Sequence, residues 1–398
     1  MTGAGLTVCD LSPFYCETGG GIRTYHRARL DWFARQDRHQ YVLVYPGPRS
    51  QVTRVGPSTT IVRVFGPRLT ADPLGYRFSL GYRFVRDAIR DLRPDVLETG
   101  DPWLSSPIGL LLRHRGVFDG VLASFCHIDT MSTYIEPFFA KLALPAAVSL
   151  RLGRVADRLL TAAPRRFDIT FVASETMRER LLARGLPNVV KAPFGVDAAL
   201  FDICRACRRR EGARILYAGR LDRDKDIALL KDTAPGLLQR ADVRLTVVGK
   251  GREARFFSSL AHPRFRFLPF VRDPHELYRL YAEHDILVAP GRFETFGLTA
   301  LEGMAAGLVV VGPDAGGTGE LLRQTGSPFV FQAGDSTGMR DAIIAAVEAE
   351  LLPYATRGRD LARSAYGTWA DAVGRQVGIY EAFAHSKSSN SANPANPS

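Results

Sequence analysis

The sequence is poor in cysteine and has no long apolar run. Five cysteines among 398 residues are too few, and an odd number, for a disulfide framework. The uncharged runs fall short of the roughly 18 residues that a membrane-spanning helix requires. The opening stretch, MTGAGLTVCD, reaches an acidic residue without the basic and apolar regions of a secretory signal. We therefore expect a soluble protein of the cytoplasm.

Several common catalytic and metal-binding motifs are also missing. The chain has no H-E-x-x-H helix and no G-x-x-x-x-G-K-[ST] phosphate loop. No D-x-D sequence is convincing as a metal site. Cys204 and Cys207 form a lone C-x-x-C pair, without the second pair or the nearby histidines that a zinc site needs. We expect neither a resident metal nor a cofactor.

The charge that is present is uneven. The formal net charge is +11, of which +9 falls in residues 1–195 and +2 in residues 196–398. A basic half favours a polyanionic neighbour, such as an anionic lipid surface, an acidic substrate or nucleic acid. The alternative is an arginine-rich composition without such a partner, because Arg far outnumbers Lys. Nucleic acid is the weakest of these, since no aromatic and basic motif accompanies the charge.

Short apolar runs alternate with amphipathic segments along almost the whole chain. The predicted helices of the first half include 22–33, 78–92 and 104–114. This alternation indicates βαβ units and parallel sheets, and about twelve strands are too many for one comfortable open sheet. The fold class is therefore α/β, with two Rossmann-like doubly wound domains rather than a closed eight-fold barrel. The predicted strands are 6–9, 41–45, 61–65, 95–98, 121–125, 169–173, 214–218, 245–248, 265–268, 286–288, 309–311 and 329–331.

The domain boundary is predicted between Lys191 and Arg214, where a polar stretch separates two strands. We assign 1–195 to the first domain and 196–385 to the second, with the last helix as a candidate to pack back on the first. The tail 386–398, SKSSNSANPANPS, has no large apolar side chain and is expected to be disordered.

Loops after strands are the places to search, because ligands of open α/β sheets bind beyond the carboxyl ends of the strands. Residues 18–23, TGGGIR, follow the first strand and open a helix. There Gly20 and Gly21 would let the backbone approach an anion. A dinucleotide fingerprint needs glycine where the chain has Thr24, so the match to a dehydrogenase is poor. A turn without a ligand is the alternative.

Three further loops carry candidate residues. His127 follows the strand 121–125 and would orient a substrate, with a structural histidine as the alternative. Arg220 and Lys225 follow the strand 214–218 and suit phosphate oxygens, with an exposed salt-bridged turn as the alternative. Gly249 follows the strand 245–248 and would either approach a nucleotide or turn the chain.

The most specific pattern is ETFGLTALE, residues 294–302. Glu294 and Glu302 are separated by seven residues, so that one lies on a loop and the other inside the helix that follows. Carboxylates accept hydrogen bonds from sugar hydroxyls, and a helix start between them suits a phosphate. Two carboxylates on a solvated helix are the alternative, which the apolar neighbours of Glu302 disfavour.

Together these motifs resemble the retaining, nucleotide-sugar-dependent glycosyltransferases of family four (group 1), which have the GT-B architecture with two domains facing a central cleft. The likeness covers about residues 1–385 and is most specific in ETFGLTALE. GRLDRDK, VVGKG, GGGIR and the segments VASE and VVKAPFGVD support it. It implies that the first domain lies on the acceptor side and that the second binds the donor.

The resemblance also implies roles for the candidate residues. Gly20 and Gly21 would lie against the donor diphosphate, and Arg220 with Lys225 would neutralise it. His127 would sit beside the transferred sugar.

In the second domain Glu302 would hold the ribose hydroxyls and Glu294 would contact the transferred sugar. Backbone N–H groups for the sugar or phosphate would come from Phe296, Gly297, Leu298 and Thr299. Two positions depart from the family pattern: Asp226 replaces the glycine that usually follows the lysine, and GGTGELL leaves the role of Glu320 open.

The implied function is transfer of a hexosyl unit, with retention, from a UDP- or GDP-sugar to a hydroxyl of a lipid, lipid-linked or saccharide acceptor. The basic first half and the segment 138–144, FFAKLAL, suit an acceptor at the inner face of an anionic membrane, with an ordinary core helix as the alternative. Another GT-B sugar-nucleotide enzyme, such as a hydrolase or epimerase, and a non-catalytic nucleotide-sugar binding protein are the competing functions.

Overall fold

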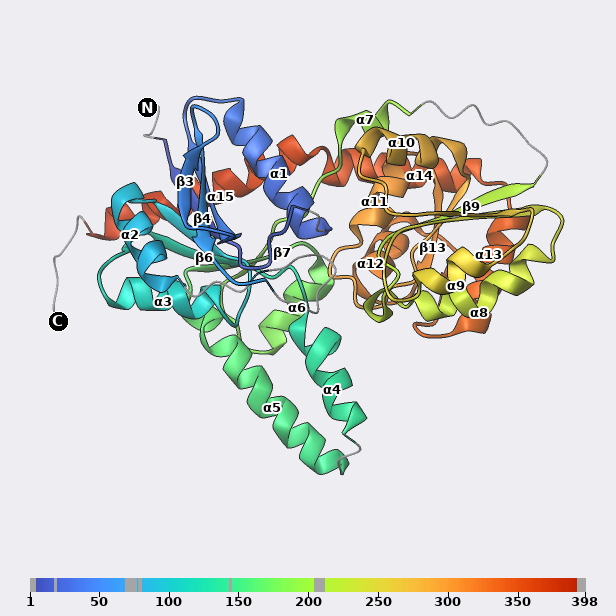
Figure 1. The fold of residues 1–398 in the computed structure, drawn as a ribbon, viewed down its shortest axis with the longest axis horizontal. Coiled ribbons are helices and arrows are strands. Elements are labelled where there is room, and N and C mark those ends of the chain that lie inside the picture. Colours follow the sequence, from blue (N-terminus) through green and yellow to red (C-terminus); the bar gives the residue numbers. More distant parts are fainter. Residues whose placement is uncertain are drawn as a thin grey trace. The chain divides into compact units, whose positions relative to one another are not determined.

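The computed structural model describes residues 5–17, 20–68, 77, 81–142, 145–203 and 212–391. The chain divides into two compact α/β units. The first comprises Met1–Ala173, Arg178–Ala192 and Ala372–Ser398, and the second comprises Ser174–Met177 and Pro193–Asp371. The final helix thus belongs mostly to the first unit, although it follows the second in sequence (Figure 1).

The first unit is built on a sheet with the strand order β3-β4-β2-β1-β5-β6-β7-β8. Its neighbouring strands are parallel except for β3, which runs antiparallel to β4. Its strands are β1 (Thr7–Leu11), β2 (Gln40–Gly47), β3 (Gln51–Arg54), β4 (Thr59–Phe65), β5 (Val96–Thr99), β6 (Val121–Phe125), β7 (Ile169–Val172) and β8 (Val189–Lys191).

Helices connect these strands in the order expected of βαβ units. Two of them, α6 and α15, contribute residues to both units. The helices are α1 (Gly21–Ala34), α2 (Tyr82–Leu92), α3 (Ser105–His114), η1 (Met131–Ile135), α4 (Glu136–Lys141), α5 (Ala146–Ala162), η2 (Pro164–Arg166), α6 (Glu175–Ala183) and α15 (Trp369–Ser391).

The second unit has a parallel sheet with the order β11-β10-β9-β12-β13-β14. The strands are β9 (Ala213–Ala218), β10 (Val243–Val248), β11 (Phe265–Leu268), β12 (Ile286–Val288), β13 (Val309–Pro313) and β14 (Val330–Phe331). The helices are α7 (Ala198–Phe201), η3 (Arg223–Lys225), α8 (Ile227–Leu238), α9 (Ala254–Ser259), α10 (Pro274–Glu283), α11 (Leu298–Ala305), α12 (Gly316–Thr325), α13 (Ser336–Glu348), α14 (Leu352–Leu361) and η4 (Ala362–Tyr366).

Each of the twelve predicted strands overlaps a strand of the structure, which confirms the α/β prediction. The structure adds β3 and β8, which sequence analysis missed. β3 is an edge strand whose side chains alternate between partly buried and exposed, and β8 has three residues, so neither shows a buried apolar run. The predicted helix 78–92 begins at Tyr82 in the structure, and residues 78–80 lie outside the described residues.

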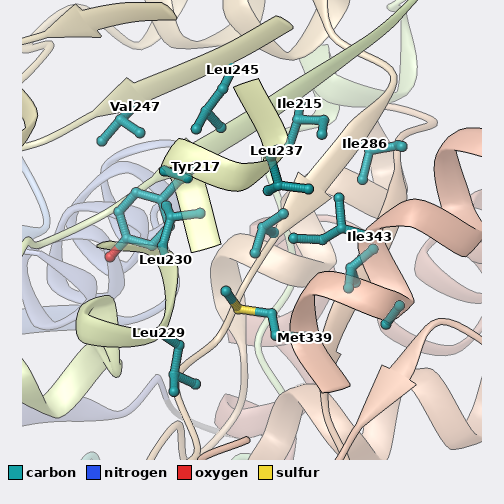
Figure 2. Close-up of a cluster of buried hydrophobic side chains, with 14 of the residues drawn as sticks. Ile215, Tyr217, Leu229, Leu230, Leu237, Leu245, Val247, Ile286, Met339 and Ile343 are labelled. Carbon is teal, nitrogen blue, oxygen red and sulfur yellow. The ribbon is translucent and has the colours of Figure 1, made fainter. Parts of the chain in front are cut away.

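The core of the second unit fills the space between its sheet and the flanking helices. Ile215 and Leu245 come from neighbouring strands, and Leu230, Leu237 and Ile343 come from α8 and α13 (Figure 2). All five side chains are almost fully buried. Apolar runs on both faces of a parallel strand require this cover, because helices pack on each side of such a sheet.

The core of the first unit also encloses charged side chains. Arg29 on α1 is fully buried and its Nη1 donates to Glu98 Oε1 of β5 at 3.1 Å. On α15, Gln376 Nε2 donates to Glu98 Oε2 at 3.1 Å and the Tyr380 hydroxyl donates to the same oxygen. Since a buried charge needs such partners, this cluster fastens α15 to the first unit.

The end of α15 differs from the expectation for the tail. The helix continues to Ser391, whereas we expected disorder from residue 386. Lys387 on this last stretch donates to Asp168 Oδ2 at 2.7 Å, which holds it against the first unit. Residues 392–398 of the predicted tail lie outside the described residues.

In both sheets the connections change direction beside a central strand. In the first the change falls between β1 and β5, and in the second between β9 and β12. Loops that diverge from two such strands open a crevice at their carboxyl ends, where ligands of doubly wound sheets bind. The loops after β9 and β12 are the ones that carry Arg220, Lys225 and Glu294.

Among the residues that the structure describes, none of the helices combines the length and the apolar character needed to cross a membrane.

Candidate active site

The loop after β9 presents two basic side chains. Arg220 Nη1 donates to Asp222 Oδ2 at 3.0 Å, and its Nη2 donates to Asp224. Lys225 ends the short helix η3, and its Nζ donates to Glu294 Oε1. About a third of each basic side chain is exposed, at 36% for Arg220 and 28% for Lys225. Both cations therefore reach solvent at the end of β9 while carboxylates hold them in place.

Tyr217 lies beneath this group of charges. Its hydroxyl donates to the backbone oxygen of Arg220 at 2.6 Å. Burial raises the pKa of Tyr217, and the carboxylates of Glu294 and Asp224 raise it further. The hydroxyl thus stays protonated and supports the backbone of the loop. The ring of Tyr217 itself belongs to the buried cluster of this unit (Figure 2).

Asp226, which departs from the family pattern, keeps the backbone conformation of a glycine. Its φ of +48° is left-handed, a conformation in which aspartate is tolerated better than most side chains. Its carboxylate accepts from the backbone N–H of Arg292 at 2.8 Å and from Arg292 Nη2 at 2.7 Å. The departure therefore preserves the turn and ties the loop after β9 to the loop after β12.

Gly249 is required by a close approach of two loops. A Cβ atom there would stand 1.8 Å from the backbone oxygen of Gly219. The N–H of Gly219 donates to the oxygen of Val248 at 3.0 Å, so the loops after β9 and β10 run together. This packing accounts for the glycine without a ligand, and its contact with a nucleotide stays a prediction.

The glutamate pair lies as the spacing predicts. Glu294 is on the loop after β12, and Glu302 is inside α11, which begins at Leu298. Gly297 precedes the helix with a φ of +83°, and a Cβ there would press on Thr318 at 2.9 Å. Glycine at this position therefore allows the tight turn from which the helix starts.

The segment between the glutamates contributes a buried side chain to the core and backbone N–H groups to the candidate site. The ring of Phe296 is 4% exposed and packs edge-on against Phe194, with 5.1 Å between ring centroids. It is thus part of the core rather than a side-chain contact for a substrate. The first backbone N–H groups of α11, which include those of Leu298 and Thr299, have no partner within the helix, as at any helix start.

Glu302 is held by a tyrosine that sequence analysis missed. The hydroxyl of Tyr281, on α10, donates to Glu302 Oε2 at 2.9 Å. Burial raises the pKa of Glu302 from 4.5 to about 7, the hydrogen bond from Tyr281 lowers it, and Asp197 raises it. Asp197 accepts from the hydroxyl of Tyr278 at 2.8 Å. Two tyrosines and two carboxylates thus meet at this end of the second unit.

The remaining candidates belong to the first unit. Gly20 precedes α1 and Gly21 is its first residue, while Thr18 and Gly19 of the same loop lie outside the described residues. His127 follows β6, and its ring stacks on Phe125 with 4.5 Å between centroids. The ring of Tyr25, on α1, packs edge-on against the ring of His127, with 4.9 Å between centroids. The helix that begins at Gly21 therefore contacts His127.

The protonation of His127 is set by its surroundings. Burial lowers its pKa to about 3, and the nearby His26 and Arg29 lower it further while Glu98 opposes them. His127 is therefore neutral at physiological pH. A neutral imidazole suits a hydrogen bond to a hydroxyl, whereas a general acid needs the charged form.

Among the predicted residues of the second unit, the structure brings Lys225 and Glu294 into contact and places Arg220 close by. Sequence analysis missed Arg292 and Tyr281, which have no motif signal of their own.

Glu320 accepts from the backbone N–H groups of Glu175 and Thr176 at 3.0 and 2.9 Å. This contact gives Glu320 a structural role at the start of α6. Cys204 and Cys207 lie outside the described residues.

Known proteins resemble this chain in sequence. A family model of glycosyl transferases group 1 matches residues 212–349. The GDP-mannose-dependent alpha-mannosyltransferase of Mycolicibacterium smegmatis is 30% identical over 371 residues, which are 87% of this chain and 90% of that protein. The GDP-mannose-dependent alpha-(1-6)-phosphatidylinositol dimannoside mannosyltransferase of Mycobacterium tuberculosis is 28% identical over 321 residues, which are 77% of this chain and 79% of that protein.

Solved structures share the fold at lower identity. Sucrose-phosphate synthase from Thermosynechococcus elongatus superposes with a TM-score of 0.72 at 18% identity, covering 95% of this chain and 98% of that chain. An alpha,alpha-trehalose 6-phosphate synthase from Burkholderia multivorans gives a TM-score of 0.67 at 16% identity, covering 99% and 100%. The fold of this chain is the GT-B fold.

Proposed function

Since this chain belongs to the group 1 glycosyl transferases, we propose that it moves a hexosyl unit from a nucleoside-diphosphate sugar to a hydroxyl of a lipid-linked or saccharide acceptor. The observation that carries the proposal is the grouping of Arg220, Lys225 and Glu294 at the carboxyl ends of β9 and β12. This is the position at which a doubly wound sheet binds a nucleotide.

For the donor we propose GDP-mannose, ahead of UDP-sugars. Relatives at 28 to 30% identity over more than three quarters of this chain are named as GDP-mannose-dependent mannosyltransferases. Arg220 and Lys225 would neutralise the diphosphate, and backbone N–H groups at the start of α11 would donate to it or to the sugar. Glu302 would accept from the ribose hydroxyls and Glu294 from the sugar.

The chemistry we propose is transfer with retention and without a divalent ion. The bond between the anomeric carbon and the phosphate oxygen breaks, and its electron pair leaves with the diphosphate. The acceptor oxygen bonds to the same face of that carbon, and its proton passes to the departing phosphate oxygen. Arg220 and Lys225 would stabilise the charge that develops on this leaving group, as fixed cations do in a preorganised site.

For the first unit we propose the acceptor side, with Gly20 and Gly21 against the donor diphosphate and His127 beside the transferred sugar. A lipid-linked acceptor is favoured because the relative from Mycobacterium tuberculosis is named for a phosphatidylinositol dimannoside acceptor. The net charge of +9 in residues 1–195 supports work at the periphery of an anionic membrane, on its cytoplasmic face.

A screen of nucleotides by thermal shift tests the proposal. GDP and GDP-mannose are expected to raise the melting temperature by several degrees at concentrations far above the dissociation constant, and UDP or ADP by less. Lys225→Ala protein is the control and should show little shift. Transfer of labelled mannose to a lipid extract, with the α anomer in the product, would support retention. Release of free mannose alone would make the protein a hydrolase, and no shift with any nucleotide would contradict the proposal.

The elevated pKa of Glu302 gives the donor affinity a pH dependence. A carboxylate accepts from two ribose hydroxyls, whereas a protonated carboxyl does so less well. Because the pKa is about 7, affinity should fall as pH drops below 7, by up to about tenfold per pH unit. Tyr281→Phe removes the hydrogen bond that lowers this pKa, so the midpoint should move to higher pH. Calorimetry between pH 5.5 and 8.5 measures both.

The control for this profile is Glu302→Gln, which should bind weakly at every pH. The same ionisation affects folding with the opposite sign. A carboxyl whose pKa rises on folding destabilises the native state as pH increases from about 4.5 towards 7, and Glu302→Gln should remove this decline. A pH profile of donor binding that is identical in the wild type and Glu302→Gln would exclude Glu302 as the titrating group.

A further inference from the structure

An apolar stripe lies exposed along α5. Val148, Leu152, Val155 and Leu159 follow the spacing i, i+4, i+7, i+11, which places them on one face of a helix. Their exposed fractions are 42, 39, 53 and 71%. Single exposed apolar residues need no explanation, but a continuous stripe of four marks an interaction surface.

Little else covers this helix. Of the α5 side chains that the structure describes, Thr161 alone is buried. The helix packs mainly against η1, α4 and η2, and Figure 1 shows α4 and α5 extending beyond the sheet of the first unit. On α4 and just after it, Phe138 and Leu142 are 56 and 49% exposed. The alternative of an ordinary core helix at 138–144 therefore does not hold for these two side chains, and residues 143–144 lie outside the described residues.

Arginines run along one flank of the stripe. Arg151, Arg154 and Arg158 are exposed and recur every three or four residues. The acidic residue of α5, Asp157, falls about half a turn from the stripe, and its carboxylate pairs at 3.5 Å with Arg184, which directly follows α6. The flank beside the stripe is therefore basic, with the acid directed to the opposite side.

We propose that α5 docks this protein on an anionic lipid surface, with the apolar stripe in the interfacial layer and the arginines at the lipid phosphates. An apolar face bordered by basic residues is the pattern of helices that lie in a membrane interface. A second copy of the chain fits less well, because a two-fold contact sets the same patch against itself and would oppose the two arginine flanks. This inference deepens the membrane contact proposed above and does not depend on glycosyl transfer.

Vesicle co-sedimentation of the full chain tests it without any substrate. Wild-type protein should bind vesicles that contain phosphatidylglycerol and phosphatidylcholine, and hardly bind phosphatidylcholine alone. Leu152→Ser with Leu159→Ser should lower the partition coefficient on the order of tenfold, as should Arg151→Gln with Arg154→Gln and Arg158→Gln. Binding of the wild type should weaken as salt rises.

Matched controls separate the surface from bulk charge and apolarity. Arg255, Arg272 and Arg279 are exposed in the second unit, and their joint replacement by Gln removes the same charge. Leu352→Ser removes an apolar side chain that is 51% exposed on α14. Both control proteins should bind vesicles like the wild type. All variants alter exposed side chains, so their melting temperatures and GDP binding should stay at wild-type values.

Three outcomes would overturn the inference. Undiminished vesicle binding by both α5 variants is the first. An equal loss in the arginine control would assign binding to net charge. A wild-type dimer in light scattering, converted to monomer by the leucine variant without loss of lipid binding, would assign the stripe to contact between copies. Loss of vesicle binding with GDP binding intact keeps the two proposals distinguishable.

Discussion

Lys225→Ala is expected to lower kcat/KM by a hundredfold to a thousandfold, the range seen when one preorganised donor to a developing charge is removed. The structure gives two reasons. The ammonium group is the partner of Glu294 Oε1, so its loss removes a cation from the diphosphate and leaves a carboxylate uncompensated beside it. Because an unpaired negative charge repels the donor, both KM and kcat should worsen.

Arg220→Ala is expected to have a similar but smaller effect, roughly tenfold to a hundredfold, which corresponds to a hydrogen bond to a charged group. Its guanidinium holds Asp222 and Asp224 in the protein without donor. Removing it leaves both carboxylates near the proposed diphosphate. The measurements are steady-state kinetics and calorimetric titration with GDP.

Matched controls exist for both substitutions. Lys231 pairs with Glu253 at 3.1 Å, and Arg240 pairs with Asp242 and Glu348, so each control removes a cation with the same kind of partners elsewhere in the second unit. Lys231→Ala and Arg240→Ala should leave kinetics unchanged. Wild-type GDP affinity in both Lys225→Ala and Arg220→Ala would refute the assignment of a diphosphate site to this loop.

The second large effect is expected from the glutamate pair, whose members should separate in kinetics. Glu294→Gln should lower kcat more than it raises KM, because a contact with the sugar strengthens as positive charge develops at the reacting carbon. Glu302→Gln should chiefly raise the donor KM, because ribose binding is the same in the ground and transition states. Each loss should be about tenfold or more, as for a charged hydrogen bond.

The control for this pair is Glu253→Gln, which alters a carboxylate paired with Lys231 without touching the proposed site. Melting temperatures distinguish the alternative in which the glutamates only steady the fold. That alternative gives lower melting temperatures with near-normal kinetics in the folded protein. Wild-type turnover in both variants, or effects of the opposite kind, would rule out the roles proposed for Glu294 and Glu302.

Sequence analysis located the strands of this protein well because a parallel strand buried on both faces is a short apolar run. Ile286, Leu287 and Val288 illustrate this, since all three are buried in β12. The same rule misses β3, where Val52 is 53% exposed and the strand lies at the sheet edge. An edge strand is defined by its pairing with a neighbouring strand, and the residues of the edge strand alone do not reveal that pairing.

The residues of the candidate site also differ in whether the sequence could predict them. Lys225 and Glu294 carry a motif signal, because chemistry fixes which side chains can meet a phosphate or a sugar. Tyr281 and Arg292 carry none, since each acts through another side chain that folding brings near: Glu302 for the tyrosine and Asp226 for the arginine. Asp226 departs from the family pattern, yet its left-handed backbone and its ion pair with Arg292 show a second way to build the turn.

The attachment of α15 to the first unit has a consequence for synthesis on the ribosome. Glu98 and Arg29 emerge early, but Gln376 and Tyr380, which complete their buried cluster, are made after the whole second unit. Until then the nascent first unit lacks the helix that covers this charge. The second unit consists of Ser174–Met177 and the continuous range Pro193–Asp371. Its last residue is therefore synthesised before Ala372–Ser398, the final segment of the first unit. In biosynthesis the later half of the gene product therefore finishes before the earlier one.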